Sequence, residues 1–99
     1  MARWIAYFED DADMQWVRAK HGQEHFDYLA RHVDKIKIGG GLRNESDGPW
    51  VGGLWVLEVA DRDEAAHLCE HDPYFKLGLR KSYRLMLWGK APFYGDIVL

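Results

Sequence analysis

The order of its strand-like and helix-like stretches limits what this chain can fold into more than any other feature. Strand-like stretches are rich in β-branched and aromatic residues or alternate apolar with charged ones, whereas helix-like stretches repeat apolar residues at helical spacing. The order is strand, helix, strand, strand, helix, strand, which predicts an α+β fold: a four-stranded antiparallel sheet with two helices on one face. We expect strands at residues 3–8, 35–42, 50–59 and 80–88, and the first helix between residues 14 and 33.

Local signals indicate where the helices begin, break and end. Gly22 is a candidate break in the first helical stretch, so residues 14–33 form one helix or two. Asp61 is a candidate N-cap of the second helix, and Glu64, three residues later, completes a capping-box pattern. Pro73 ends or bends this second helix, because proline disfavours helical geometry in the residue before it.

The aromatic content is large for a chain of 99 residues, which carries five Trp, five Tyr and four Phe. Two helices cover only one face of a four-stranded sheet, and the predicted strands are apolar on both faces. A large uncovered apolar face favours association, so we expect a homodimer in which two open sheet faces form a shared core. Two alternatives remain open: some rings line a pocket, or they fill an ordinary core with few rings exposed.

Composition and charge exclude several classes of function. The net charge is −3 and no basic stripe is present, so we expect no nucleic-acid partner. No apolar run approaches the ~20 residues that span a bilayer, and the N-terminus has no signal-peptide pattern. The single Cys69 cannot form an intramolecular disulfide, and we expect one domain over residues 1–99 in a reducing cytoplasm, with no membrane partner.

His25 and Asp72 are the residues whose surroundings indicate chemistry. His25 lies among the apolar residues of the first helix, where a histidine is more often a core residue than a catalyst. Asp72 precedes Pro73, whose fixed backbone can hold the neighbouring carboxylate in a set direction, although the same turn also serves to stop a helix. The fold places both helices on one face, where the two side chains can meet, and a carboxylate against a histidine ring makes a general base.

Other reactive residue types lack the spacing that a site needs. Neither pair of histidines spaced four residues apart encloses the glutamate of a zinc-protease motif, and there is no second cysteine, so we expect no metal. Cys69 lies in a stripe of alanine and leucine and resembles a small core residue. The three glycines at residues 39–41 lack the spacing of a phosphate loop, but they permit close approach of a ligand.

Five segments of the chain carry a resemblance to a known family. They are His25-Phe26-x-Tyr28-Leu29, Gly39-Gly40-Gly41-Leu42, Gly52-Gly53-Leu54-Trp55-Val56, Glu64-Ala65-Ala66, and Asp72-Pro73-Tyr74 followed by Gly78. In their order and spacing, across nearly the whole chain, they resemble the YCII-related family. The resemblance implies a ferredoxin-like domain of the dimeric α/β-barrel group. It also implies that His25 is a general base, that Asp72 orients it and that Pro73 positions the pair.

The same resemblance implies a mostly apolar pocket beside this pair. We expect Gly53, Trp55, Tyr74 and Phe75 to contact a small-molecule substrate there. Family members often carry a small hydroxyl residue at the place where this chain has Gly53. The hydrogen bond that such a hydroxyl would give a substrate is therefore missing from this chain.

These expectations lead to three hypotheses about function. The first is a cofactor-free enzyme, lyase- or isomerase-like, in which His25 and Asp72 abstract a proton from a small aromatic, quinol or lactone-like compound. It follows from the resemblance, because one characterised branch of the family removes chloride from a chlorinated hydroxyquinol and more distant barrel relatives isomerise lactones. The second is a non-catalytic ligand-binding module on the same dimer. The third is a dimeric accessory protein that contacts a larger enzyme through the tail Phe93-Tyr94-x-x-Ile97-Val98-Leu99.

Overall fold

The computed structural model describes residues 1–95 and has the predicted order of strands and helices. The strands are β1 (Ala2–Asp10), β2 (Ile36–Arg43), β3 (Trp50–Val59) and β4 (Arg80–Leu87), the helices are α1 (Trp16–Arg31), α2 (Arg62–Glu70) and α3 (Pro73–Lys76), and two 3-10 turns are η1 (Ala12–Met14) and η2 (Pro92–Tyr94). The sheet has the order β2-β3-β1-β4, and every neighbouring pair of strands is antiparallel. The predicted α+β fold is therefore confirmed.

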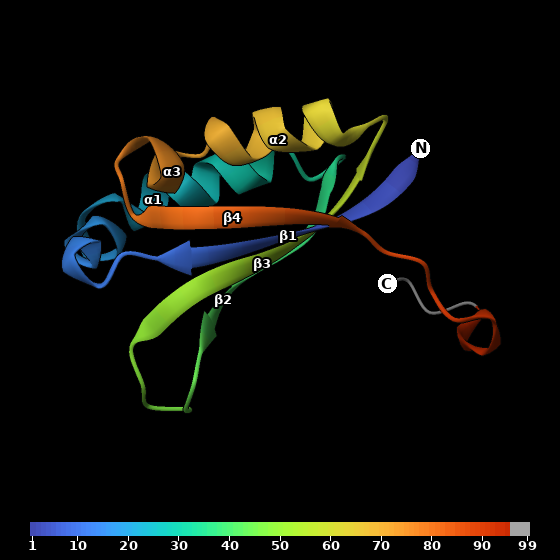
Figure 1. Cartoon of the computed structure of the whole chain (residues 1–99). Helices are drawn as coiled ribbons and strands as arrows, with labels where there is room; N and C mark the ends of the chain where they lie inside the picture. The colour runs from blue at the N-terminus through green and yellow to red at the C-terminus, as the bar shows by residue number, and fades with distance from the viewer. Residues whose placement is uncertain (96–99) are drawn as a thin grey trace.

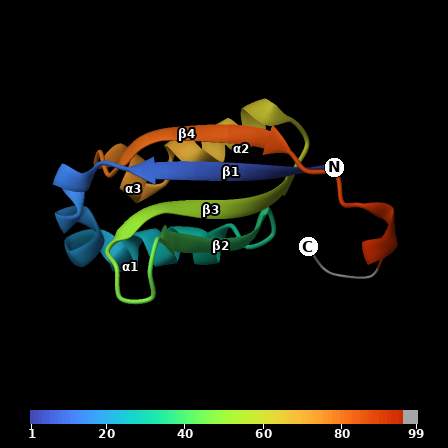
Figure 2. The ribbon, with the colours of Figure 1, turned by 60° about the horizontal axis from the view of Figure 1, so that its bottom comes forward.

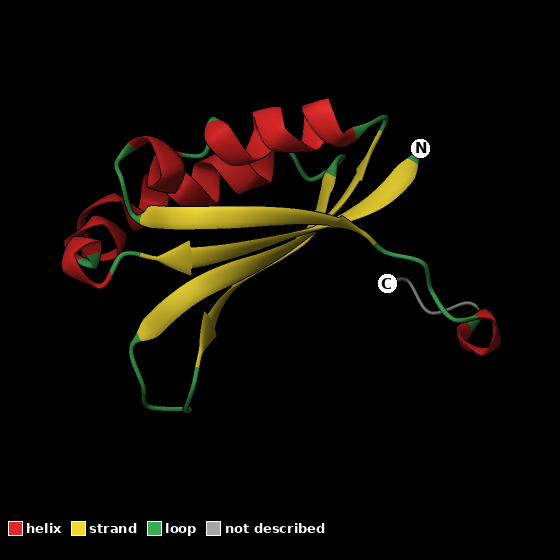
Figure 3. Cartoon of the chain, viewed as in Figure 1, coloured by secondary structure: helices red, strands yellow, loops and turns green. Residues whose placement is uncertain are grey.

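The molecule has two layers, a sheet and a layer of helices that covers one face of it (Figure 1, Figure 3). Figure 2 shows the four strands side by side, with the helices behind them. The internal strands turn large apolar side chains toward the helices, among them Trp4, Phe8 and Trp55, which belong to the buried core. The rings of Phe8 and Trp55 meet edge to face with their centroids 4.7 Å apart, a favourable aromatic geometry.

Helix α1 is interrupted close to the predicted break. The sequence placed that break at Gly22, and the backbone leaves helical geometry at the neighbouring His21, with φ −119° and ψ 15°. The residues that α1 buries are Val17, His25 and Tyr28, and the last two lie on the same helix face because they are one turn apart. This is how α1 directs His25 toward the interior of the molecule.

Helix α2 begins with the predicted capping box. Asp61 Oδ1 accepts a hydrogen bond from the Glu64 N–H at 2.9 Å, and Glu64 Oε1 accepts one from the Ala60 N–H at 2.8 Å. The prediction for Pro73 is corrected in one respect: α2 ends before it, and Pro73 is the first residue of the separate helix α3, with Asp72 as its N-cap. Proline suits this position because its missing N–H would have no partner in a first helical turn.

The face of the sheet away from the helices is open and apolar. It carries a hollow of about 480 Å³ to which all four strands contribute. Ile38 of β2, Leu54 of β3 and Met86 of β4 line this hollow and are 45%, 37% and 38% exposed. The sequence prediction of an uncovered apolar face is therefore correct for this chain, whereas the pairing of two such faces stays a prediction.

The described part of the C-terminal segment extends away from the sheet (Figure 1). Phe93 and Tyr94 lie in η2 and are 79% and 50% exposed. The remaining apolar residues of the tail hypothesis, at 97–99, lie outside the described residues. Within residues 1–95, no helix combines the length and the apolar character needed to cross a membrane.

Gly52 of β3 occupies a position where no side chain fits. A Cβ atom there would lie 2.2 Å from the carbonyl oxygen of Phe8, a backbone atom of the internal strand β1 that cannot move without disturbing strand pairing. We predict that Gly52→Ala lowers the free energy of unfolding by about 3 kcal/mol or more, measured by urea denaturation. The control is Gly89→Ala, because a Cβ there meets no atom within 4 Å. Equal stability of the two variants would contradict this account.

Candidate functional site

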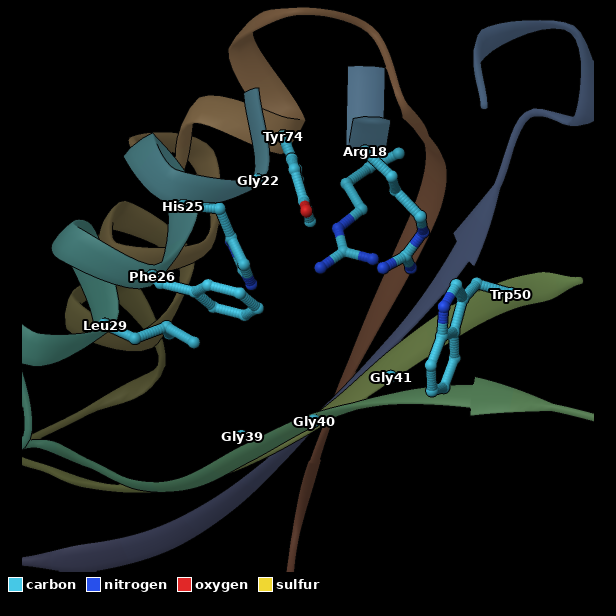
Figure 4. A pocket seen from close by; sticks show the side chains of 11 residues that line it. Arg18, Gly22, His25, Phe26, Leu29, Gly39, Gly40, Gly41, Trp50 and Tyr74 are labelled. Carbon is cyan, nitrogen blue, oxygen red and sulfur yellow. The ribbon is translucent and has the colours of Figure 1, made fainter. Parts of the chain in front are cut away.

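A cavity of about 290 Å³ opens on the helical side of the sheet. Its volume is at the small end of the range for small-molecule sites. Figure 4 shows His25 and Phe26 on one wall, and Arg18 and Trp50 on the other. The lining residues are Arg18, Gly22, His25, Phe26 and Leu29 of α1, Gly39, Gly40 and Gly41 of β2, Trp50 of β3, Tyr74 of α3 and Arg80 of β4.

His25 and Asp72, which the sequence proposed as a pair, are hydrogen-bonded, with His25 Nδ1 2.7 Å from Asp72 Oδ1. The side chain of His25 is 8% exposed and that of Asp72 is 0% exposed. An ionised carboxylate has only acceptors, so Nδ1 carries the hydrogen and donates it. The neutral ring then keeps its free lone pair on Nε2, and Figure 4 shows this ring reaching into the cavity.

Local structure explains how Asp72 reaches this position. As the N-cap of α3, its Oδ1 also accepts a hydrogen bond from the backbone N–H of Tyr74 at 3.3 Å. Pro73 follows as the first helical residue and has no N–H to compete for the carboxylate. The pair of His25 and Asp72 therefore links α1 to α3 across a separation of 47 residues.

Tyr74 forms part of the same wall. Its ring stacks on the ring of His25, with centroids 3.9 Å apart and an interplanar angle of 9°. Burial raises the pKa of the Tyr74 hydroxyl above its ordinary value, against the lowering effect of Arg18 and Arg80. The hydroxyl is therefore protonated at neutral pH and offers a hydrogen-bond donor beside the cavity.

The glycines of β2 give the cavity a floor of bare backbone. A Cβ atom at Gly39 would lie 3.0 Å from Cδ1 of Trp55, and one at Gly41 would lie 2.8 Å from Cε3 of Trp50. Both distances are too short for an ordinary contact, so the tryptophan rings fill the space that side chains would need. Gly39, Gly40 and Gly41 line the cavity without side chains of their own, and close approach of a ligand to them stays a prediction.

Sequence analysis did not identify Arg18, Trp50 or Arg80 as site residues. Arg80 is paired with Asp10 in the sheet, and the register of β1 against β4 shifts between Glu9 and Asp10. Simple alternation along β4 assigns Arg80 to the open face, and the irregular register brings it to the cavity instead. The sequence does place an acid, Asp10, at the end of the first strand and a base, Arg80, at the start of the last strand. This pattern predicts a contact only once the two strands are known to be antiparallel neighbours.

Gly53, Trp55 and Phe75, which were expected to contact a substrate, do not line this cavity. Trp55 lies in the core and is 1% exposed, and the ring of Phe75 packs on the edge of Tyr83, with centroids 5.7 Å apart. A Cβ atom at Gly53 would lie 3.1 Å from Nη1 of Arg80, so this glycine leaves room for the guanidinium group. Direct contact of these three residues with a substrate stays a prediction.

Cys69 belongs to the core, in agreement with its sequence context. It is fully buried on α2. Burial, together with a smaller effect of Asp72, raises the pKa of its thiol to about 12, and a protonated thiol is a weak nucleophile. Among the described residues, no group of three or more His, Cys, Asp or Glu side chains is arranged to hold a metal ion.

Comparisons with known proteins agree with the fold and with the family resemblance. A family model, the YCII-related domain, matches residues 2–89, which is most of the chain. Among curated proteins, none matches this sequence. Solved structures do match it, and the match covers 96–97% of the three structures described next.

Three of these structures illustrate the range of similarity. The 5-chloro-2-hydroxyhydroquinone dehydrochlorinase (TftG) from Burkholderia phenoliruptrix AC1100, in complex with 2,5-dihydroxybenzoquinone, has a TM-score of 0.83 and 24% identity over 92% of this chain and 97% of that chain. Protein Atu4242 from Agrobacterium tumefaciens has a TM-score of 0.53 and 14% identity, covering 94% and 96%. An uncharacterized NIPSNAP domain protein from Burkholderia xenovorans has a TM-score of 0.51 and 12% identity, covering 94% and 97%. At these identities, what the structures establish is the shared fold.

We predict that the thiol of Cys69 does not react with the thiol reagent dithiobis(nitrobenzoate) in the folded protein at pH 8. A pKa of about 12 leaves roughly one thiol in 10⁴ ionised at this pH. In urea the pKa returns toward ~8.5, and the single thiol should then react fully within minutes. The absorbance of the released thiolate measures both reactions, and rapid reaction of the folded protein would show that Cys69 is accessible.

Proposed function

We propose that this chain, which belongs to the YCII-related family, is a small-molecule enzyme that uses His25 as a general base and Asp72 to orient it. The substrate is a small aromatic, quinol or lactone-like compound bound in the cavity beside His25. The observation that carries this proposal is the buried hydrogen bond of 2.7 Å between His25 Nδ1 and Asp72 Oδ1. It leaves the other ring nitrogen free to accept a proton on the cavity side.

In the proposed reaction, Nε2 of His25 takes a proton from an acidic hydroxyl or an activated carbon of the substrate. The electron pair left behind moves into the substrate. It takes up a proton from the imidazolium at another atom, so that the substrate isomerises. Where that atom is the carbon that bears chlorine, loss of a second hydroxyl proton to His25 then lets chloride leave, so that the substrate loses H⁺ and Cl⁻ in sum. Asp72 keeps Nδ1 protonated and stabilises the imidazolium throughout. Neither route requires a metal or an organic cofactor.

One fold neighbour supports this class of reaction. The dehydrochlorinase TftG acts on a chlorinated hydroxyhydroquinone, and its structure holds 2,5-dihydroxybenzoquinone, a single-ring quinone. The cavity of this chain, at about 290 Å³, is large enough for one substituted ring, since a cavity of ~150 Å³ holds benzene. The size of the cavity and the pairing of His25 with Asp72 therefore both suit a compound of this kind.

A second candidate function is a non-catalytic ligand-binding or accessory module on the same scaffold. The observation that favours it is the number of lining residues that can bind without reacting. Phe26, Leu29 and Trp50 give the cavity an apolar wall, which is sufficient to hold a small ring by itself. Turnover separates this function from the first, because a binding module would return its ligand unchanged.

We predict that the wild-type chain turns over 5-chloro-2-hydroxyhydroquinone or another compound in a panel of monocyclic quinols and lactones. His25→Ala should lower kcat/KM by about 10²- to 10⁴-fold, because it removes the general base, while the affinity for 2,5-dihydroxybenzoquinone stays within a few-fold. Chloride release and absorbance follow the reaction, and calorimetry follows binding.

The control for this prediction is His67→Ala, which removes an exposed histidine outside the cavity and should leave turnover unchanged. Equal turnover by wild type and His25→Ala would contradict the proposed role of His25. Binding of the quinone by both proteins, with no turnover by either across the panel, would favour the binding-module function.

The oligomeric state completes the proposal: two chains pair through their open sheet faces. The support lies in the apolar hollow of about 480 Å³ on that face. Side chains such as Leu54 and Trp88 are each 37% exposed there, and a contiguous apolar surface of this kind is unusual on a monomer. The cavity beside His25 lies on the other side of the sheet, so pairing would leave it open.

We predict that the wild type sediments as a dimer and that Leu54→Glu sediments as a monomer, because a carboxylate in the apolar hollow cannot be paired across the interface. The matched control is Val33→Glu, which places the same charge on an apolar side chain that is 63% exposed and lies outside the open face. Sedimentation equilibrium measures all three proteins. A monomeric wild type, or dissociation of the control alone, would argue against this interface.

A further inference from the structure

We propose that Arg18 and Arg80 form an anion-binding subsite in the cavity, and that the substrate is therefore a monocyclic compound bearing an ionised oxygen. Figure 4 shows Arg18 across the cavity from His25, and both arginines line the cavity. The inference rests on the proposed function for the identity of the substrate site. The charge preference of the cavity holds whether or not turnover occurs.

One buried carboxylate fixes both guanidinium groups. The side chain of Asp10 is 1% exposed, and its Oδ2 accepts a hydrogen bond from Arg18 Nε at 2.9 Å and lies 2.7 Å from Arg18 Nη2. The other oxygen, Oδ1, accepts a hydrogen bond from Arg80 Nη1 at 3.0 Å. Two arginines thus share Asp10, and Arg80 Nη2 also lies 3.8 Å from Asp72 Oδ2. The two carboxylates balance the two arginines while His25 is neutral, and one positive charge is in excess here once His25 takes up a proton.

Both arginines retain donors that the protein itself does not use. Arg18 gives its Nε to Asp10 and donates from Nη2 to the carbonyl oxygen of Gly52 at 2.9 Å, which leaves Nη1 for a ligand. The side chain of Arg80 is 2% exposed, and its Nε is buried without a hydrogen-bond partner among the described residues. Unmet donors on buried cations are costly, and an anion that accepts a hydrogen bond from Arg18 Nη1 would lower that cost.

Aromatic rings hold these guanidinium groups in place. Arg18 Cζ lies 5.8 Å from the ring centroid of Trp50 and 5.2 Å from that of Tyr74. Arg80 Cζ lies 4.3 Å from the ring centroid of Phe8 and 5.2 Å from that of Tyr74. Contact with a ring face leaves the in-plane N–H groups of an arginine free to donate, so the subsite is ordered before a ligand arrives.

The negative charges nearby are directed away from a ligand. Asp10 and Asp72 are both buried, and no carboxylate of the described residues lines the cavity. Asp72 Oδ2 lies 3.8 Å from Arg80 Nη2, which is too long for a hydrogen bond, and the charge of Asp72 balances the imidazolium once His25 has taken up a proton. The excess positive charge of the arginines is then left to balance the anion that the substrate has become.

The shape of the cavity limits the anion to one ring. The volume of about 290 Å³ admits a single ring with small substituents. Tyr74 lies between His25 and Arg18, and Phe26 and Leu29 of α1 add an apolar wall on the other side of His25 (Figure 4). A planar ring with an ionised oxygen fits this combination, whether the oxygen belongs to a phenol, a hydroxyquinone or a carboxylic acid.

The test measures binding to the wild-type chain, because His25→Ala would leave the buried charge of Asp72 without its partner beside Arg80. Calorimetry compares two matched pairs of probes: 2,5-dihydroxybenzoquinone, which is ionised at neutral pH, against its dimethyl ether, and benzoate against benzamide. We expect the anion of at least one pair to bind roughly tenfold to 100-fold more tightly than its neutral partner, because hydrogen bonds to a charged group contribute free energy of this size. A preference in the first pair identifies a quinone-type oxygen, and one in the second identifies a carboxylate. Equal affinity within both pairs overturns the proposal.

Arg18→Met is the main variant, because it keeps the apolar stem and leaves Asp10 paired with Arg80. It should remove most of the preference for the anion and leave the affinity for the neutral probe within about twofold. Arg31→Met on the same helix is the control, since Arg31 lies outside the cavity lining. Arg80→Lys tests the second arginine and keeps a cation against the buried Asp10. An unchanged preference in both Arg18→Met and Arg80→Lys overturns the subsite.

The outcomes for the two proposals are separable. Selective anion binding that depends on Arg18, together with turnover that does not depend on His25, would support the subsite and reject the general base. Turnover that requires His25, together with equal binding of anion and neutral partner, would support the base and reject the subsite.

Discussion

The arrangement of the site depends on a carboxylate that is removed from water. Asp72 is fully buried, and a buried charge is tolerated only where hydrogen bonds and opposite charges compensate it. The partners come from three elements: the imidazole of His25 on α1, the N–H of Tyr74 on α3 and the guanidinium of Arg80 on β4. Oδ1 takes both hydrogen bonds, and Oδ2 has no hydrogen-bond partner among the described residues and is compensated only by the charge of Arg80. These contacts fix α1, α3 and β4 relative to one another, and the cavity is the space that they enclose with β2.

Much of the fold could be predicted from local patterns. The bounds of β3, at Trp50–Val59, agree with the sequence prediction, because a long apolar run between turn residues has one natural length. The capping box at Asp61 and Glu64 was equally clear, since all of its partners lie within four residues. Both features could be predicted from the sequence alone, because the residues that determine each of them are close together in the chain.

The site could be predicted only in part, because its contacts join distant segments. Asp72 and His25 are 47 residues apart, and no local pattern states that they touch; the family resemblance and the shared helical face made the pairing plausible. Arg80 was missed because an irregular register turns it away from the face that alternation assigns. Trp55 was expected to contact a substrate from its place in a motif. Its side chain is 1% exposed and lies beside Gly39, so this contact stays a prediction.

The bare backbone at Gly39 and Gly41 has an evolutionary consequence. Every glycine codon lies a single base from a codon for alanine, and the added methyl group would press on Trp55 or Trp50. A point mutation in this strand would therefore alter the size and tilt of the compound that fits, while His25 and Asp72 stay as they are. Descendants of such a gene could exchange one ligand for another without having to reinvent the proton chemistry.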